Sequence, residues 1–281
     1  MIQVSKIHLE IDYRSSGIAQ PNKHCILTGY ELPLYGPVTD IMRPAVIICP
    51  GGAYQFVSER EGEPVASAFL AAGIDAYILE YTCADKGFFP CALLETYSAI
   101  KYVRSHAAEK SIDPNKIFLC GFSAGGHCAA AAGTLWNHEI ARLIGFTNEI
   151  HKPNGLILGY PVITATNYTH EESFRNLLGP QDSREMREFL SLENRVTKNT
   201  PRTFLWHTAG DGSVPVQNSI LFAKALADNS VPFEMHIYPY GEHGLSTARF
   251  DVLTPGRFTL NQYMLQSVPT WIHDAIRFLI G

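Results

Sequence analysis

Short apolar runs recur along the chain and alternate with segments in which apolar residues have helical spacing. The apolar runs, which predict buried β-strands, lie at 45–49, 74–81, 116–120, 154–161, 203–207 and 233–238. The segments with helical spacing or helix-favouring composition lie at 63–72, 93–106, 129–132, 215–226 and 274–280. Strands that alternate with helices in this way predict an α/β fold, in which a mostly parallel central sheet carries helices on both faces.

Two segments depart from this alternation. Residues 2–34 contain an alternating apolar and polar run at 7–11, which predicts an antiparallel N-terminal section. Residues 164–200 are polar and charged, and they precede the predicted strand at 203–207. We expect this segment to form a small helical cap that shapes a site at the edge of the sheet, and a solvated surface excursion is the alternative.

Composition limits the classes of protein to which the chain can belong. Hydrophobic residues make up 46% of the 281 positions and charged residues 17%, which predicts one large core and a single domain over 1–281. The net charge of −5 has no basic block behind it, which argues against nucleic-acid binding. No apolar stretch approaches the length of a membrane span, and no signal-sequence pattern follows Met1. We therefore expect a cytoplasmic protein whose six scattered cysteines stay reduced.

One motif points directly to chemistry, because it places a serine between a strand and a helix. Gly121-Phe122-Ser123-Ala124-Gly125 follows the predicted strand at 116–120 and precedes a run of alanines. A sharp turn of this pattern needs small residues beside the serine, exposes its hydroxyl and directs the next amide at the same space. Such a pattern also arises by chance, but the strand before it and the helix after it remove most chance matches. We expect Ser123 to be a nucleophile.

A serine nucleophile needs a base and an acid, and in this strand–turn–helix arrangement the acid precedes the histidine. Asp211 lies on the loop after the predicted strand at 203–207, and His243 lies on the loop after the strand at 233–238. Open α/β sheets place their working residues at such carboxyl ends. The sequence therefore predicts a triad in which His243 is the general base for Ser123 and Asp211 orients the imidazole.

Other residues of the same types fit these roles less well. His207 lies on a predicted strand, which favours a packed or loop-orienting role, and for His127 beside the serine turn we favour a structural role. His236 alternates along its strand and could face either way. The aspartates that lack a position directly after a strand are Asp182, Asp228 and Asp251.

A fourth part of the predicted site is a set of backbone amides for a developing negative charge. The apolar run at 45–49 ends in Pro50-Gly51-Gly52-Ala53-Tyr54, where glycines allow close approach of the backbone. We expect the amides of Gly52, Ala53 and Ala124 to form an oxyanion hole. Pro-Gly-Gly alone is an ordinary loop breaker. Its place upstream of the serine turn favours the interpretation as an oxyanion hole. The carboxylates and histidines have no metal-ligand spacing such as His-Glu-x-x-His, so no metal is expected.

These motifs together resemble the α/β-hydrolase esterase and lipase superfamily. The resemblance covers about residues 46–245 and rests on the loop at 50–54, the serine block at 113–127, the loop at 211–215 and the loop at 242–244. Within the superfamily the chain is most similar to small bacterial acetyl esterases and xylan-esterase-related hydrolases. The resemblance implies the α/β-hydrolase fold, the same triad and ester hydrolysis without a cofactor, and it is compatible with a homodimer.

One residue departs from the pattern of this family. Related esterases usually carry His-Gly-Gly-Gly or Pro-Gly-Gly-Gly in this loop, whereas this chain has Ala53 at the last glycine. Alanine still donates its amide, but a positive φ at that position would strain it.

The expected function is hydrolysis of short-chain, acetyl esters of a small soluble substrate, and the preference for an acetylated sugar comes from the resemblance alone. Tyr54, Phe88 and Phe89 are candidate walls for the acyl chain or a sugar, although core packing is the commoner role of such residues. A serine peptidase of the prolyl-oligopeptidase type uses the same triad order but usually carries a large gating domain, for which this chain has no room. A non-catalytic ligand-binding protein on the same fold usually lacks a triad member. Neither a nucleic acid nor a membrane is an expected partner.

Overall fold

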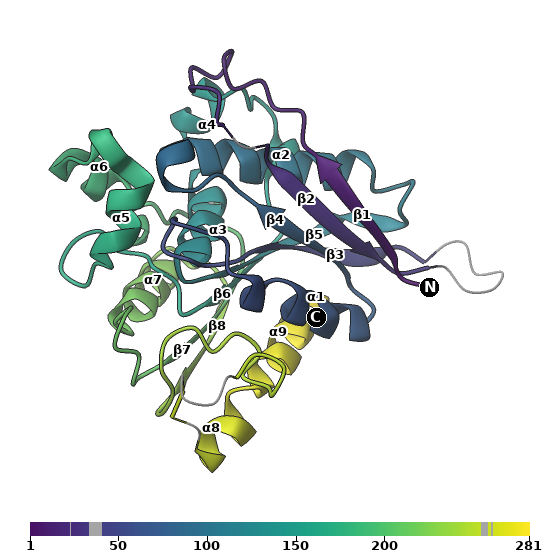
Figure 1. Ribbon diagram of the computed structural model, residues 1–281, viewed down its shortest axis with the longest axis vertical. Helices are drawn as coiled ribbons and strands as arrows, with labels where there is room; N and C mark the ends of the chain where they lie inside the picture. The colour runs from purple at the N-terminus through teal and green to yellow at the C-terminus, as the bar shows by residue number, and fades with distance from the viewer. Residues whose placement is uncertain (23, 34–40, 254–257, 260) are drawn as a thin grey trace.

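One eight-stranded sheet runs through the whole molecule (Figure 1). The computed structural model describes residues 1–22, 24–33, 41–253, 258–259 and 261–281. Its strands are β1 (Gln3–His8), β2 (Ile26–Glu31), β3 (Arg43–Cys49), β4 (Asp75–Glu80), β5 (Ile112–Phe122), β6 (Leu156–Gly159), β7 (Thr203–Thr208) and β8 (Phe233–Tyr238). Their order in the sheet is β1-β2-β4-β3-β5-β6-β7-β8. β2 pairs antiparallel with both β1 and β4, and all other neighbours are parallel.

Helices cover both faces of this sheet (Figure 1). The α-helices are α1 (Glu63–Ala71), α2 (Cys91–Ser105), α3 (Ser123–Leu135), α4 (Glu139–Leu143), α5 (Glu171–Leu178), α6 (Arg184–Phe189), α7 (Gln217–Asp228), α8 (Gln262–Ser267) and α9 (Thr270–Ile280). Short 3₁₀ turns are η1 (Glu59–Glu61), η2 (Ala84–Lys86), η3 (Glu149–His151), η4 (Gly179–Gln181) and η5 (Leu192–Asn194). Residues of α2, α3 and α7 belong to one buried cluster, and residues of α1 and α9 belong to the cluster on the opposite face.

The continuous apolar runs of the central strands supply both clusters. In β3, Ala45 and Ile47 belong to the first cluster, whereas Val46 and Ile48 belong to the second, as the two-residue period of a strand requires. All four side chains are fully buried, and burial of each large one stabilises the fold by about 1.5–3 kcal/mol. A strand buried on both faces is typical of a parallel sheet covered by helices.

The predicted fold class is confirmed, since the sheet is mostly parallel, has helices on both faces and begins with antiparallel strands. The alternating run at 7–11 lies only partly in β1, which starts at Gln3 and ends at His8, yet partial burial alternates with exposure through residue 11. The predicted N-terminal section extended to position 34, which lies outside the described residues. The pattern did not predict α4 and α8, which are only five and six residues long.

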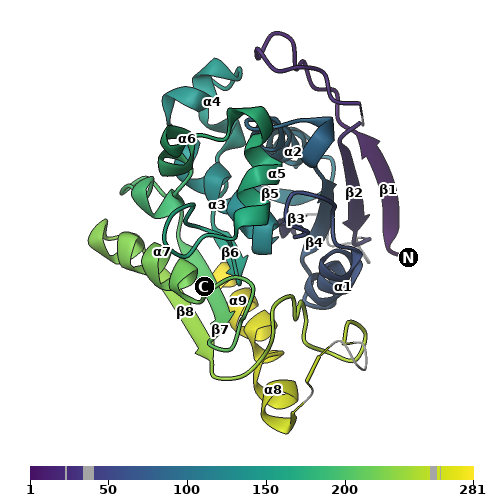
Figure 2. The ribbon, with the colours of Figure 1, turned by 60° about the vertical axis from the view of Figure 1, so that its left-hand side comes forward.

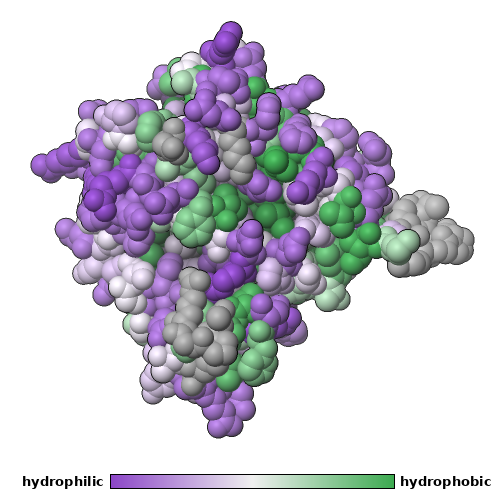
Figure 3. Space-filling model, viewed as in Figure 1, coloured by the Kyte–Doolittle hydropathy of each residue, from purple (hydrophilic) through white to green (hydrophobic). Residues whose placement is uncertain are grey.

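The segment at 164–200 folds into α5, η4, α6 and η5, and Figure 2 shows α5 in front of the sheet. It contacts loops that follow two strands, since the side chain of Asn176 donates to the Ala53 carbonyl and the Phe89 amide donates to the Leu177 carbonyl. Its role as a cap stays a prediction. Hydrophilic side chains cover much of the face shown in Figure 3, with hydrophobic ones between them. In the described part of the chain, no helix is long and apolar enough to cross a membrane.

Candidate active site

The predicted serine lies at a strained turn between β5 and α3. Ser123 is the first residue of α3 and has a φ of +53°, in the left-handed region that costs a non-glycine residue about 1–2 kcal/mol. The flanking glycines leave no room for a side chain. A Cβ at Gly125 would lie 2.0 Å from the Cys49 carbonyl oxygen, and one at Gly121 would lie 2.3 Å from the Gly125 carbonyl oxygen. The turn therefore packs directly against the end of β3 and presents the serine at the carboxyl edge of the sheet.

The structure brings the three predicted triad residues together. The Ser123 hydroxyl oxygen lies 2.8 Å from Nε2 of His243, and Nδ1 of His243 lies 2.6 Å from Oδ2 of Asp211. Because the ionised carboxylate can only accept, Nδ1 carries the proton, and Nε2 is left to accept from the serine hydroxyl. The three residues follow β5, β7 and β8, so parallel strands that end at one edge place them side by side.

The environment of Asp211 keeps its carboxylate ionised. Burial raises its pKa, but hydrogen bonds from His207 and His243 outweigh burial and hold the pKa of Asp211 well below its usual range. The amides of Ser213 and Val214 also donate to Oδ1, each at 2.9 Å. A carboxylate fixed on both oxygens can orient the imidazole and stabilise its charged form.

His207 has the loop-orienting role that its place on a strand predicts. Its side chain is fully buried, and Nε2 lies 3.0 Å from the Val214 carbonyl oxygen and 3.3 Å from Oδ2 of Asp211. Nδ1 lies 2.8 Å from the Ser219 hydroxyl, which donates to it. His207 therefore ties the loop that carries Asp211 to the start of α7.

The loop at 50–54, called here the 50–54 loop, lies against the serine turn. A Cβ at Gly51 would come within 2.9 Å of the Cβ of Ser123. The amides of Gly52 and Ala53 donate to no acceptor in the described part of the chain. Ala124 is the second residue of α3, so its amide has no acceptor one turn earlier in the helix. These amides are free to bind a negative charge beside Ser123.

The structure shows which backbone conformation alanine takes at position 53, where the resemblance to esterases predicts a glycine. Gly52 has a φ of +123°, and both Ala53 and Tyr54 have a φ of +55°. Position 53 therefore does take a left-handed conformation, and alanine adopts it at a cost of about 1–2 kcal/mol. The loop keeps the shape that glycine would allow, with strain stored at two consecutive residues.

Hydrogen bonds from outside the 50–54 loop hold this strained shape. Nδ2 of Asn176 in α5 donates to the Ala53 carbonyl at 2.8 Å. The Tyr54 hydroxyl lies 2.9 Å from Nδ1 of His127, whose Nε2 lies 3.0 Å from the Leu190 carbonyl oxygen. Burial lowers the pKa of His127 to about 4, so its neutral ring donates from Nε2 to the carbonyl and accepts the tyrosine proton at Nδ1. No local motif marked Asn176 or Leu190, because both act across long stretches of sequence.

The aromatic residues predicted as pocket walls are buried or line a cavity whose lining does not include Ser123. Tyr54 is buried and its hydroxyl is bonded to His127, while Phe89 is buried and packs edge-on against Phe189. Phe88 and Phe89 line a cavity of about 420 Å³ whose lining includes Gln181 but not Ser123. Their contact with a substrate stays a prediction.

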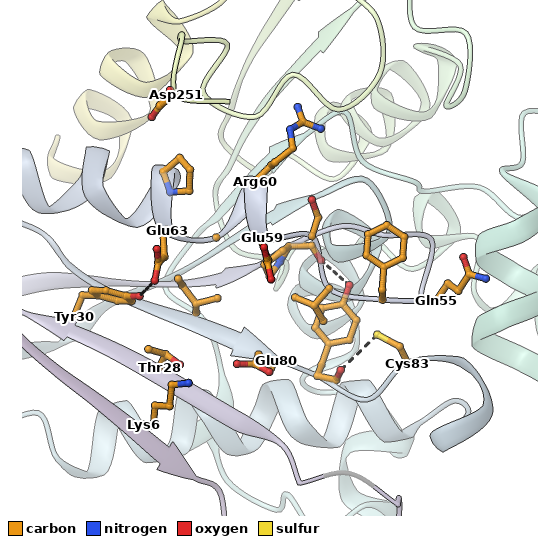
Figure 4. Close-up of a pocket in the computed structure, with 18 of the residues that line it drawn as sticks. Lys6, Thr28, Tyr30, Gln55, Glu59, Arg60, Glu63, Glu80, Cys83 and Asp251 are labelled. Carbon is orange, nitrogen blue, oxygen red and sulfur yellow. Dashed lines mark hydrogen bonds between the residues drawn. The ribbon is translucent and has the colours of Figure 1, made fainter. Parts of the chain in front are cut away.

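A larger cavity of about 850 Å³ borders the 50–54 loop and the turn after it (Figure 4). Ser123 is not among its lining residues. Charged and hydrogen-bonding side chains project into it from β1, β2, β4, η1 and α1, including Lys6, Tyr30, Glu59, Glu63 and Glu80. Among the described residues, no cluster of three or more histidine, cysteine, aspartate or glutamate side chains could hold a metal ion. All six cysteines are buried, and none of them forms a disulfide.

Two curated proteins are similar to most of this chain. Endo-1,4-beta-xylanase B of Butyrivibrio fibrisolvens is 36% identical over 231 residues, which are 80% of this chain and 36% of that protein. Acetylxylan esterase of Xylanibacter ruminicola is 27% identical over 246 residues, which are 83% of this chain and 47% of that protein. The chain therefore spans less than half the length of each of these two relatives.

Solved structures match over nearly the full length. An acetyl ester-xyloside bifunctional hydrolase from Caldicellulosiruptor lactoaceticus has a TM-score of 0.81 and 34% identity, covering 98% of this chain and 95% of its own. The carboxylesterase Cest-2923 from Lactobacillus plantarum has a TM-score of 0.80 and 26% identity, covering 100% and 97%. The BD-FAE family model matches residues 32–226, which is more than half of the chain. The protein thus belongs to the BD-FAE family and has the α/β-hydrolase fold of carboxylesterases.

Proposed function

We propose that the protein is a serine carboxylesterase that hydrolyses short-chain esters, acetyl esters above all, through an acyl-enzyme. One observation carries the proposal: Ser123, His243 and Asp211 form a continuous hydrogen-bonded chain, with bonds of 2.8 and 2.6 Å, beside free backbone amides. A binding protein would have no need of a serine held at a strained φ against a histidine that is itself oriented by an ionised carboxylate.

The chemistry follows from the placement of these groups. The Ser123 oxygen attacks the ester carbonyl carbon while Nε2 of His243 takes its proton, and Asp211 stabilises the imidazolium. The carbonyl oxygen, now negative, accepts hydrogen bonds from the amides of Gly52, Ala53 and Ala124, and each such donor lowers the barrier by roughly 2.7–4 kcal/mol. The alcohol leaves with the proton from His243. Water then attacks the acyl-enzyme by the same route and releases the acid.

The alcohol portion that we propose is a sugar. The support comes from the relatives, whose names refer to xylan, acetylxylan and an acetyl ester-xyloside. The cavity of about 850 Å³ beside the 50–54 loop is also lined with carboxylates and lysines, which suit hydroxyl groups better than an acyl chain.

The test is hydrolysis of p-nitrophenyl acetate, butyrate and octanoate, together with release of acetate from acetylated xylo-oligosaccharides. We expect turnover that is highest on the acetyl ester and is abolished in Ser123→Ala. Ser213→Ala is the matched control, because Ser213 is exposed and supplies only its backbone amide to Asp211. If no ester is turned over faster than by Ser123→Ala, the esterase proposal is wrong. Turnover of the p-nitrophenyl esters without acetate release would refute the sugar portion alone.

A further inference from the structure

Glu61 is a buried acidic residue that the proposed ester chemistry does not use. It is the last residue of η1 and only 4% exposed. Each of its carboxylate oxygens accepts a hydrogen bond from a different part of the site. Oε2 accepts from the Gly51 amide at 2.7 Å, and Oε1 accepts from the Tyr160 hydroxyl at 2.6 Å.

Tyr160 extends this connection to the loop at 239–246 that carries His243, called here the 239–246 loop. The Tyr160 oxygen accepts from the Ser246 amide at 2.9 Å. Its ring also contacts the imidazole of His243 edge-on, with centroids 5.0 Å apart and an interplanar angle of 70°. Glu61 is thus joined through one hydroxyl group to the backbone beside the proposed base.

The neighbouring residue of η1 adds two further links to the 239–246 loop. Nη2 of Arg60 donates to the Gly244 carbonyl at 2.7 Å, and the Arg60 carbonyl accepts from the Ser246 hydroxyl at 2.6 Å. In Figure 4, Arg60 projects from η1 on the side of the chain segment that carries Asp251. η1 therefore lies between the 50–54 loop and the 239–246 loop and is bonded to both.

We propose that Glu61 is a positioning residue, which fixes the 50–54 loop relative to the 239–246 loop and so keeps the amides and the base aligned on Ser123. The inference rests on the proposed esterase function. A buried carboxylate is costly unless its oxygens are bonded, and here both are bonded to donors that belong to the two loops or lead to them. Catalytic groups must keep their relative positions within a fraction of an ångström, and a misplacement of about 1 Å can cost on the order of 100-fold in rate.

Glutamine cannot replace this carboxylate, although it has the same shape. Both donors, the Gly51 amide and the Tyr160 hydroxyl, point their hydrogens at Glu61, and the Tyr160 oxygen already accepts from Ser246. An amide offers one oxygen and one NH₂ group, so one of the two hydrogens loses its acceptor in either orientation. The side chain volume stays the same, which separates loss of positioning from loss of packing.

The experiment compares Glu61→Gln with Glu31→Gln, whose buried carboxylate also accepts from a tyrosine hydroxyl, that of Tyr77 at 2.9 Å, at the end of β2 and beside the start of β4. With p-nitrophenyl acetate we expect kcat to fall on the order of 10- to 100-fold in Glu61→Gln while KM changes by less than about threefold. The kcat and KM of Glu31→Gln should match those of the wild type. The rate at which a fluorophosphonate probe labels Ser123 should fall in parallel with kcat.

A second variant keeps the inference testable if Glu61→Gln does not fold. Tyr160→Phe removes only the hydroxyl that links Glu61 to Ser246, and it should lower kcat with little change in KM. In the double variant the two losses should be less than additive, because both cut the same link. An active wild type with unchanged kcat in Glu61→Gln, or in Tyr160→Phe, overturns the inference alone. A wild-type protein that neither turns over esters nor is labelled at Ser123 overturns the proposed function, and the inference with it.

Discussion

Two substitutions at neighbouring positions test the strain in the 50–54 loop directly. Replacement of Ala53 by glycine should stabilise the protein, whereas replacement of Gly52 by alanine should destabilise it. Ala53 has a φ of +55°, where glycine is favoured, so we expect Ala53→Gly to stabilise the protein. Gly52 has a φ of +123°, and a Cβ there would lie 2.2 Å from the Phe56 carbonyl oxygen. We expect Gly52→Ala to destabilise the protein and to displace the loop.

The expected magnitude follows from two opposing free-energy differences. Relief of the left-handed strain at Ala53 contributes about 1–2 kcal/mol to the free energy of unfolding. Glycine gives the unfolded chain more conformational freedom, which costs about 0.4–1 kcal/mol. The net stabilisation is about 0.5–1 kcal/mol, or about 1–4 °C in Tm for a chain of this size. Alanine at position 52 would clash with the Phe56 carbonyl and would relieve no strain. Gly52→Ala should therefore lower the free energy of unfolding by on the order of 1–3 kcal/mol.

The assay is urea unfolding together with ester turnover. Ala72→Gly is the control for stability, because Ala72 is exposed with an ordinary φ of −96°, and we expect it to lose about 0.5–1 kcal/mol. We expect Ala53→Gly to keep kcat within about threefold, since the amide that we assign to the oxyanion is retained. Gly52→Ala should lower kcat on the order of 100-fold or more. Destabilisation of Ala53→Gly as large as that of Ala72→Gly would show that the φ of Ala53 is not strained, and the reasoning would be wrong.

Three further predictions address the hydrogen bonds around the site. Asp211→Asn should lower kcat on the order of 10⁴-fold, because the amide cannot hold the productive tautomer of His243, and a loss under tenfold in ester turnover would contradict the triad. Burial lowers the pKa of His127 to about 4, so between pH 6.5 and 4 the unfolded chain binds a proton that the folded chain does not, and stability falls as the pH drops through this window. In urea unfolding, the free energy of unfolding of the wild type should fall by about 3 kcal/mol more between pH 6.5 and 4 than that of His127→Gln. If both proteins lose the same amount, the low pKa of His127 is refuted. Asn176→Ala should lower kcat about fivefold through loss of one hydrogen bond, whereas Asn229→Ala, which removes a similar bond far from the triad, should leave kcat unchanged.

That Ser123, His243 and Asp211 lie together was predictable from the sequence, because each position is marked by local features of the chain. Ser123, Asp211 and His243 each follow a buried strand, and parallel strands bring such positions to one edge of the sheet. The residues that hold the site were not predictable in this way. Glu61 bonds to a tyrosine 99 positions away, and Asn176 bonds to a carbonyl 123 positions away. No spacing or periodicity encodes such pairs, since they depend on how loops from separate strands pack.

Strain and restraint occur together at the carboxyl edge of the sheet. Several of the non-glycine residues with positive φ lie at this edge: Ala53, Tyr54, Ser123, Tyr160, Ser246 and Ala248. At about 1–2 kcal/mol each, their strain is comparable with the whole stability of a typical domain. Loops under such strain relax when a restraint is removed, and relaxation returns part of the lost free energy. Loss of the Glu61 hydrogen bonds, as in Glu61→Gln, should therefore raise the activation free energy of turnover by more than it lowers the free energy of unfolding. A residue that only packs the core would show the opposite.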